Sequence, residues 1–456
     1  MVNGILRAST ARLGLLSTWT RGRAFLMVLV LEVLILVAYA TAVVPVYGYQ
    51  GYTYKSHGGL GLFVIVVSMT LGALPAIWLP RRIERPSHLI LWLLEITVVC
   101  STSAIVVVLP YRTIWERLGW TAWMVVALGI TSLVLCLPDL RLPQPPVTPQ
   151  TGLRLFWLGA LAVIAALLAT YGLPDLDFSL DTLYDRRMDL RETAETNSRI
   201  LGYLFTWTQY VFAPMMLISG IVRKSFASVA YGVVVYMWIF QISGSRQVLG
   251  ILPLIGLFWM LGRYKVRAPV LILGATGVLA SGFIIYLLFG GGIGSLSLNL
   301  VAKRLFVVPA VLGVFYFDYF SGHSPALYRD SFGSLVSASP YPEDIQRVIG
   351  EAYLGGGGSN ANVNVFADAF GQLWYAGLLI PLGLVVALWI LDSVTRCLHF
   401  PAVMAVVALL SIAVLNTGFT VLLLTDGFLV MLAVFWVAGS GLLPSRQEAL
   451  VAGVPE

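Results

Sequence analysis

The chain has 456 residues, of which 59% are hydrophobic and only 11% are charged, and its mean hydropathy is +0.88. Soluble domains carry about 25% charged residues, so this composition excludes a soluble globular protein. The net charge of +6 comes mostly from short basic turns, which predict membrane anchoring rather than nucleic-acid binding. The apolar runs are long and uninterrupted, which favours an all-α polytopic membrane protein over a β-barrel.

These runs predict about twelve transmembrane helices in a single integral membrane domain, residues 1–456. In chain order the predicted spans are 24–46, 59–80, 88–110, 119–138, 154–173, 200–222, 226–243, 247–262, 268–289, 373–392, 400–424 and 427–444. Two polar stretches, 174–199 and 290–372, hold 13 of the 22 acidic residues and are predicted to be outer loops.

Basic residues set the predicted orientation. Four arginines precede the first span without a small-residue cleavage site, which predicts a signal anchor that stays in the protein. The basic turns 81–85, 223–224 and 263–267 fall at alternate connections, which the positive-inside rule places in the cytoplasm. An even number of crossings then returns the C-terminus to the cytoplasm as well.

The run 305–320 (LFVVPAVLGVFYFDYF) lies within the second outer loop. It is short and contains Pro309, and a crossing here would place Arg396 outside and the rest of the long loop inside. The sequence therefore predicts a re-entrant or interfacial helix, with an additional crossing as the alternative.

A fixed charge interrupts the apolar stretch 226–262. This stretch is long enough for two short crossings, with Ser243-Gly-Ser-Arg246 as the tight outer apex between them. A guanidinium at the bilayer centre would cost about 2.5–3.5 kcal/mol, whereas at the rim of a cavity it can pair with an anion. The predicted partner of Arg246 is a phosphate, and the alternative is snorkelling to lipid headgroups.

Several motifs occur together in the second half of the chain. They are the Ser243-Gly-Ser-Arg246 apex, Arg304-Leu-Phe-Val-Val-Pro309, His323-Ser-Pro-Ala-Leu-Tyr-Arg-Asp330, Asn360-Ala-Asn-Val-Asn364 and Phe370-Gly-Gln-Leu-Trp-Tyr-Ala-Gly377. In these motifs the sequence resembles the Wzy-type O-antigen polymerases, which join oligosaccharide repeat units and are related in fold to O-antigen ligases. The likeness covers roughly residues 200–395 by motif and the whole chain by topology.

The resemblance implies a membrane glycosyltransferase of the C superfamily type in the bacterial cytoplasmic membrane. Such an enzyme transfers a glycan from its undecaprenyl diphosphate carrier to a sugar hydroxyl of the next lipid-linked repeat unit, on the outer face. It implies as partners the lipid-linked oligosaccharide, membrane lipids, and chain-length regulator and flippase proteins. The family's Arg-x10-Gly pattern matches Arg191 to Gly202 and Arg347 to Gly358, which makes Arg191 and Arg347 candidate substrate-binding residues.

Departure of a diphosphate leaving group requires preorganised positive charge near the outer headgroups. The candidate diphosphate-binding residues there are Arg246, Lys303, Arg304 and Arg329. The alternative for each is a helix-end or lipid anchor. The loop 290–372 has no Asp-x-Asp pair and the three cysteines lack metal-ligand spacing, so the expected mechanism uses neither a metal nor a cofactor.

The acceptor hydroxyl needs a base or an orienting acceptor. His323 is the first catalytic candidate, because its ordinary pKa of about 6.5 suits neutral operation, and a surface histidine without a catalytic role is the alternative. Asp330 is the second candidate, unless it is in a structural ion pair with Arg329, and Asp318 is the third. Arg246 completes the predicted catalytic set.

The remaining candidates concern sugar binding and loop closure. Outer-loop tyrosines such as Tyr319 can stack on sugar faces, although tyrosine is also enriched at membrane interfaces. Tyr319 and Asn364 are predicted to bind substrate. The run Gly355 to Gly358 predicts the hinge of a lid, and Asp368 is expected to cap the next span.

Glu32 and Glu95 lie within predicted spans, where a lone carboxylate is costly. They keep a transporter or flippase for lipid-linked glycans as an alternative, although no repeated halves are visible. A ligase that transfers finished glycan to another acceptor is a further alternative within the same fold.

Overall fold

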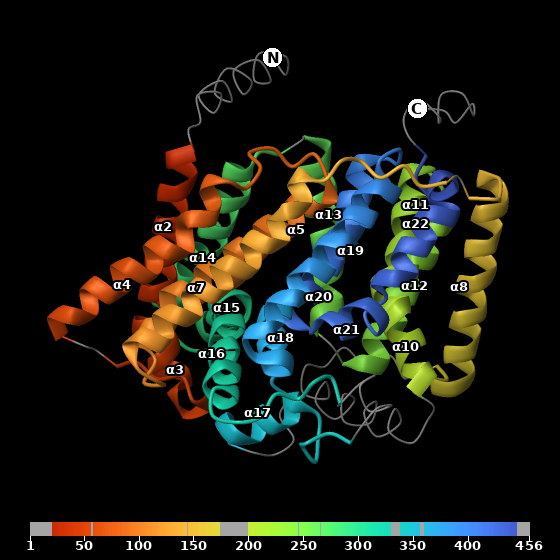
Figure 1. The fold of residues 1–456 in the computed structure, drawn as a ribbon. Helices are drawn as coiled ribbons and strands as arrows, with labels where there is room; N and C mark the ends of the chain where they lie inside the picture. The colour runs from red at the N-terminus through yellow and green to blue at the C-terminus, as the bar shows by residue number, and fades with distance from the viewer. Residues whose placement is uncertain are drawn as a thin grey trace.

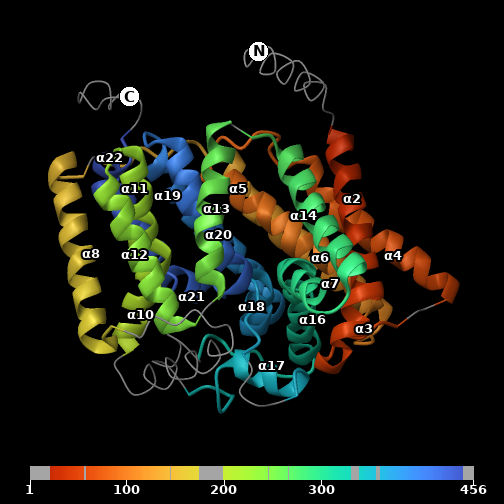
Figure 2. The ribbon, with the colours of Figure 1, turned by 180° about the vertical axis from the view of Figure 1, so that it is seen from behind.

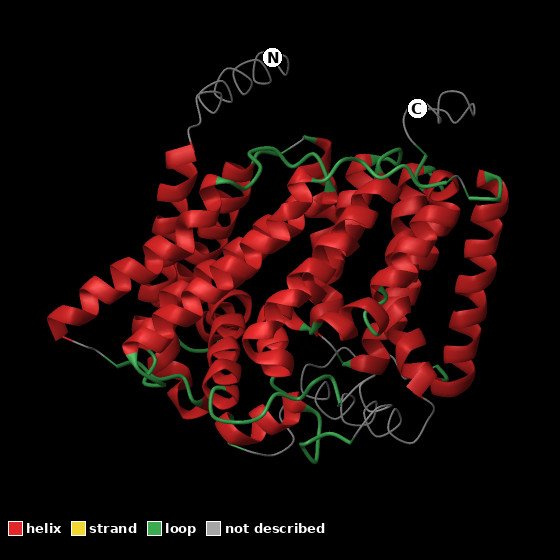
Figure 3. Cartoon of the chain, in the orientation of Figure 1, coloured by secondary structure: helices red, strands yellow, loops and turns green. Residues whose placement is uncertain are grey.

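The computed structural model describes residues 21–55, 58–143, 145–173, 199–244, 246–264, 266–329, 338–355 and 360–444, with the side chains of 58–60, 199 and 246–250 outside this description. Within these ranges every regular element is a helix (Figure 3). Ten helical segments of the described chain are long and apolar enough to cross a membrane, and three shorter apolar helices accompany them. The prediction of an all-α polytopic membrane protein is therefore confirmed.

The helices follow one another along the chain with short connections. The first group is α2 (Arg21–Ala38), α3 (Val44–Tyr47), α4 (Gly58–Ala73), α5 (Pro86–Leu94), α6 (Cys100–Ile105), α7 (Ile114–Thr131) and α8 (Pro149–Tyr171). The second is α10 (Arg199–Trp207), α11 (Ala213–Val222), α12 (Phe226–Ser243), α13 (Arg246–Arg263) and α14 (Ala268–Phe289). The third is α15 (Ile293–Ser297), α16 (Val308–Phe320), α17 (Ile345–Tyr353), α18 (Val365–Leu373), α19 (Leu379–Thr395), α20 (Phe400–Asn416), α21 (Phe419–Leu424) and α22 (Phe428–Leu442).

π-Helical turns join several of these pieces into longer helices. They lie at Tyr39–Val43, Glu95–Val99, Thr208–Phe212 and Leu298–Val307. The last of them joins α15 to α16, so the apolar run predicted at 305–320 is the second half of one segment, Ile293–Phe320. The polar residues before Leu305 hid the first half from the sequence pattern.

The helices divide into two groups around a centre that contains α18 (Figures 1 and 2). The helices α2 to α7 and α14 to α16 form one side of the molecule, with α4 projecting at its edge, and α8, α10 to α12 and α19 to α22 form the other. Stacked aromatic rings fill the contact of α7 with α16 and α18. Trp120 stacks on Trp123 with ring centroids 5.1 Å apart and on Phe317 at 4.8 Å, and Phe370 meets Trp120 edge to face.

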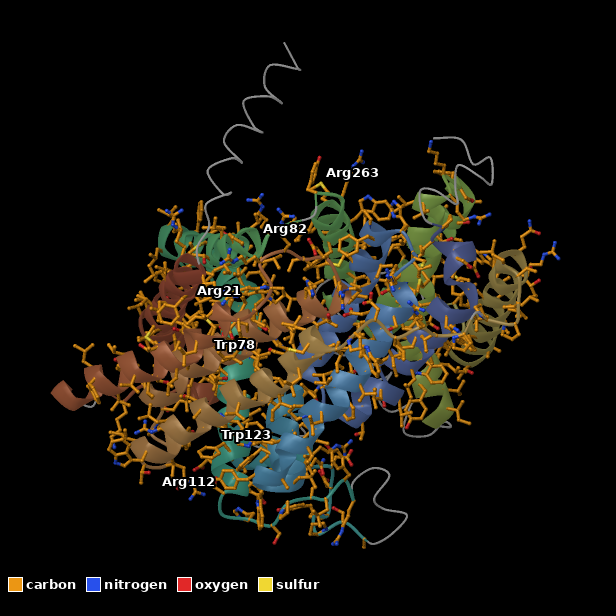
Figure 4. The ribbon with its side chains drawn as sticks, turned by 45° about the horizontal axis from the view of Figure 1, so that its top comes forward. Arg21, Trp78, Arg82, Arg112, Trp123 and Arg263 are labelled. Atoms are coloured by element: carbon orange, nitrogen blue, oxygen red, sulfur yellow. The ribbon has the colours of Figure 1, made fainter. Side chains whose placement is uncertain are left out.

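The basic turns gather at one end of the bundle, which we call the arginine end. Arg21, Arg82 and Arg263 lie there in Figure 4, whereas Arg112 lies at the opposite, distal end. Backbone hydrogen bonds join two of the turns, from Ile83 N to the Val266 carbonyl at 3.1 Å and from Ala268 N to the Arg81 carbonyl at 2.9 Å.

An acidic residue joins two further arginines at the arginine end. The carboxylate of Asp139 lies 3.1 Å from the guanidinium of Arg85 and 3.1 Å from that of Arg396. The connection after α19 therefore lies at the same end of the bundle as the connection before α5.

The hairpin predicted between residues 226 and 262 is confirmed. Its helices are α12 and α13, and Ser225 caps the first of them by accepting a hydrogen bond from Ser228 N. Gly244 ends α12 in the left-handed conformation, with φ of 56°, where a side chain would be strained. The apex therefore turns at the predicted residues.

Two C-terminal predictions are wrong in their boundaries. The span predicted from residue 373 begins earlier, at Val365, and its N-cap is Asn364 rather than Asp368. The segment then breaks at Trp374, whose φ is 51°, before a 3-10 turn leads into α19. An early start was missed because an Asp, a Gln and a Gly interrupt the hydropathy of α18.

The span predicted at 400–424 is also interrupted. The helix α20 ends at Asn416 because Thr417 is extended, and Gly418 then caps the short helix α21, which lies crosswise between α20 and α22 (Figure 1). The side chain of Thr417 donates to Asp426 Oδ2 at 2.7 Å, so a polar contact holds the break inside the bundle.

Candidate distal-end site

Lys303 lies in an aromatic cage at the distal end. The π-helical turn that carries it packs against the segment after α3, so that its Nζ donates to Gln50 Oε1 at 2.5 Å. The same ammonium lies 4.0 Å from the ring centroid of Tyr47 and 5.3 Å from that of Tyr52. Lys303 is only 7% exposed, and no carboxylate among the described residues lies within ion-pair distance of it. Its charge is compensated only by dipoles and aromatic faces.

Arg304 is the exposed neighbour of Lys303 on the same helical turn. Burial raises the pKa of the Tyr52 phenol to about 12, while the charge of Arg304 acts in the opposite direction. Tyr52 therefore stays protonated at neutral pH and keeps its hydroxyl as a donor. Two adjacent cations, one caged and one free to reach out, give this region positive charge without a bound acid.

A second cluster centres on Asp318, near the end of α16. Arg112 Nε donates to Asp318 Oδ1 at 2.8 Å, and the hydroxyl of Tyr353 donates to Oδ2 at 2.5 Å. The Tyr353 ring stacks on Phe315 with centroids 4.5 Å apart, and Tyr111 meets both rings edge to face. These contacts tie α17 to α16 and to the turn before α7.

Asp318 and its partners hold the Tyr353 phenol as a fixed donor. Burial raises its pKa well above the ordinary value, and the hydrogen bond to Asp318 and the carboxylate charge act in the same direction. A Cβ on Gly51 would lie 3.0 Å from the Tyr353 carbonyl, so the segment after α3 runs directly against α17. The Lys303 cage and the Asp318 cluster are thus neighbours along one surface.

His323 lies just beyond α16, exposed at the distal end. Its ring stacks on Tyr319 with centroids 4.0 Å apart and planes 5° apart, and its Nδ1 lies 2.8 Å from the Tyr319 carbonyl. Trp374 donates its indole N–H to the carbonyl of His323 at 3.1 Å. The backbone and one ring nitrogen are therefore held in place, while the exposed face of the imidazole remains open to solvent.

The ring of Tyr341 completes this aromatic group. It lies 6.2 Å from the Tyr319 ring, centroid to centroid, and its hydroxyl donates to the Ser324 carbonyl. Burial and the neighbouring Tyr319 raise the pKa of Tyr341 to about 12. An aromatic platform of this kind can stack on the apolar face of a sugar.

Buried polar side chains continue inward from this end along α18. Asn364 is fully buried and caps the helix, with its Oδ1 accepting from Phe366 N and Ala367 N, both at 3.1 Å. Gln372, at the other end of α18, accepts from Tyr328 N at 2.6 Å. Both side chains serve the backbone in this conformation.

Beyond α18 the polar interior reaches the break in α20. The carboxylate of Asp368 packs against the backbone of Gly418, where an added Cβ would lie 2.3 Å from its Oδ2. Asp426 lies behind the same break and is only 5% exposed. Two carboxylates therefore flank the Thr417–Gly418 backbone inside the bundle.

The other predicted site residues are placed as follows. Arg329 and Arg347 are half-buried, on the turn after α16 and on α17 respectively. Arg191, Asp330 and Gly358 lie outside the described residues, as does the side chain of Arg246, whose backbone begins α13. The described groups that gather at the distal end are the Lys303 and Arg304 pair and the Asp318, Tyr319 and His323 group.

Sequence reasoning missed Arg112 and Tyr353 as the partners of Asp318, and Asp426 as a buried acid. Arg112 had a readable signal, because it is an arginine in a turn that alternates with the basic turns of the other end. Asp426 had one as well, since it separates two apolar runs. The contact of Tyr353 with Asp318 joins residues 35 apart and had no local signal.

The comparisons with known proteins add no assignment. Neither the family models nor the curated proteins and solved structures gave a match to this chain.

Proposed function

We propose that the protein is a membrane glycosyltransferase that polymerises polyprenyl-diphosphate-linked repeat units at its distal end. The observation that carries this proposal is the Lys303 cage. An ammonium that is 7% exposed and lacks a carboxylate partner among the described residues is a site prepared for an anion. The exposed Arg304 beside it extends the positive charge to the surface, and a diphosphate carries the matching negative charge.

The arrangement of the two ends supports an external site. Under the positive-inside rule the arginine end faces the cytoplasm and the distal end faces outward. The contacts of Asp139 with Arg85 and Arg396 keep the start of α5 and the end of α19 on one side. Lys303 contacts the segment after α3 and Asp318 contacts Arg112, so both ends of α16 lie near outer turns. On this basis the segment 293–320 enters and leaves on the outer side.

The chemistry then divides among neighbouring residues. Lys303 and Arg304, with Arg246 at the start of α13 and Arg329 after α16, stabilise the charge on the departing diphosphate. Tyr319 and Tyr341 provide a face on which an acceptor sugar stacks. His323, with its ring held against Tyr319, accepts the proton of the attacking hydroxyl.

The test replaces single cations in a strain that depends on this chain for its surface polysaccharide. K303A and R246A should reduce long-chain polymer at least about tenfold and accumulate single repeat units, since one lost contact to developing charge costs about 2.7–4 kcal/mol in known cases. The matched control is R263A, which removes an arginine from the opposite end of α13. Undiminished chain length in both K303A and R246A, with normal protein levels, would contradict the proposal.

Reconstitution separates this function from transport and ligation. Vesicles containing the purified protein receive lipid-linked repeat units on one face only. Polymer that forms without movement of the lipid across the membrane supports polymerisation, and movement without polymer supports a flippase. Transfer only to a different acceptor supports a ligase.

A further inference from the structure

Two glutamates lie deep inside the N-terminal helices, away from the distal-end surface. Glu32 is on α2 and Glu95 begins the π-helical turn between α5 and α6, and the exposed fraction of each is 0%. At a rise of about 1.5 Å per residue, Glu95 lies roughly 14 Å along its helix from Pro86, near the middle of a membrane-spanning segment. Acids in such positions are rare and usually bind or conduct an ion.

The two carboxyl groups face one site. Glu95 lies near enough to Glu32 for its charge to act on the Glu32 carboxyl, and both act on the thiol of Cys100. Ser103, on α6, donates to Glu32 Oε1 at 2.5 Å and also lies within 2.8 Å of the Cys100 carbonyl. The site is therefore assembled from α2, the π-helical turn and α6.

The helix α4 closes this site with a glycine. A Cβ on Gly72 would lie 2.1 Å from Ser103 Oγ and 2.5 Å from Glu32 Oε1, so no larger residue fits. One turn earlier on the same face, Ser68 donates to the Ser103 carbonyl at 2.8 Å and lies 3.1 Å from Thr121 Oγ1. The hydroxyls of Ser68 and Thr121 continue the polar interior toward α7.

Oxygen atoms at this site lack partners. Glu32 Oε2 and both carboxyl oxygens of Glu95 are buried without a hydrogen bond, as are the hydroxyls of Ser101 and Thr102 on α6. Among the described residues neither glutamate has an ion-pair partner. Two carboxylates cannot both remain charged in an apolar interior, because each loses its hydration and repels the other.

We propose that Glu32, Glu95 and Ser103 form a binding site for a single monovalent cation, a proton or a sodium ion. One positive charge held between the carboxyl groups removes their repulsion and satisfies the free oxygens. The site is independent of the proposed glycosyl transfer, because none of its residues belongs to the distal-end surface. It gives the protein a means to respond to the ion gradient across the membrane.

The probe is dicyclohexylcarbodiimide, which reacts with protonated carboxyl groups in apolar surroundings. The full-length protein in lipid vesicles is treated at several pH values with and without sodium chloride, and the adducts are located by mass spectrometry. We expect an adduct on Glu32 or Glu95. If the site binds only protons, labelling falls about tenfold per pH unit above its pKa and ignores sodium. If it binds sodium, salt at ten times the dissociation constant leaves about one-tenth of the labelling.

Variants show whether the two acids act as one site. E95Q should change the pH or sodium dependence of labelling at Glu32, and E32Q should do so at Glu95. G72A should abolish both dependences by pushing a methyl group between Ser103 and Glu32, whereas G119A, at a position with no atom within 4 Å of an added Cβ, should change neither. The proposal is overturned if neither glutamate reacts in folded protein, or if labelling of each is unaffected by pH, by sodium and by replacement of the other.

Discussion

Single residues at the distal end divide into those that serve the fold and those that keep free chemistry. Asn364 uses its side-chain oxygen for two backbone amides and its amide for the Pro309 carbonyl, at 3.4 Å, so all of its polar atoms face inward. Lys303, in contrast, has a full charge and only neutral partners. Sequence pattern offered both as ligand-binding residues, and only the contacts distinguish them.

The cap predicts a stability effect. N364A should lower the free energy of unfolding by about 1–2 kcal/mol, because Phe366 N and Ala367 N lose their acceptor inside the bundle. Thermal or denaturant unfolding in detergent measures the difference. The matched control is N362A, two residues earlier in the same segment and exposed. Equal stability of both variants would contradict the structural role of Asn364.

At the scale of elements, α17 is the piece that lies over the distal end. It is held by the Tyr353 hydroxyl on Asp318, by the stack of Tyr353 on Phe315, and by the backbone hydrogen bond from Ala361 N to the Gln346 carbonyl at 2.9 Å. Gly355 follows in the left-handed conformation, with φ of 84°. Few contacts hold a short helix in place here, which is what a segment that opens over a site requires.

This attachment predicts a change in local opening. Y353F removes the hydroxyl and keeps the ring stack, so it should accelerate amide hydrogen exchange in residues 345–353 about tenfold. That corresponds to about 1.5 kcal/mol, the lower end of the range for a hydrogen bond to a charged group, because Asp318 is 20% exposed. The control is Y375F, whose ring is 68% exposed and packs on Phe370. Unchanged exchange in Y353F would show that the stack alone holds α17.

At the scale of the whole molecule, charge separates the two ends of the bundle. The basic turns and the Asp139 ion pairs gather at one end, and the Lys303 cage, the Asp318 cluster and His323 gather at the other (Figure 4). An even number of crossings between Arg85 and Arg396 follows from their shared contact with Asp139. This parity is the structural basis for treating α16 as a segment of the outer side.

Cysteine labelling checks the orientation. In a background that lacks Cys100 and Cys136, S324C should react with a membrane-impermeant maleimide in intact spheroplasts, because residue 324 is exposed at the distal end. The native Cys397, exposed next to Arg396, should react only after permeabilisation. Labelling of Cys397 in intact cells would reverse the proposed orientation and remove the external site.

Local pattern was sufficient for the features that depend on neighbours in the chain. Hydropathy specified the helical class, and the Ser–Gly–Ser apex specified the turn at Gly244, because burial of apolar helices in lipid and the freedom of glycine are local effects. Alternating basic turns likewise predicted which connections share one end, and Arg82 and Arg263 lie together as expected.

Only the tertiary structure decided how the polar residues are used. Sequence could not show that Lys303 meets Gln50, that Asp318 meets Arg112 and Tyr353, or that Glu32 and Glu95 face one site, since each contact joins segments far apart in the chain. In a membrane every apolar surface finds a favourable neighbour, either lipid or protein. Hydrophobicity therefore places helices across the bilayer, while close packing and polar contacts between them select their partners.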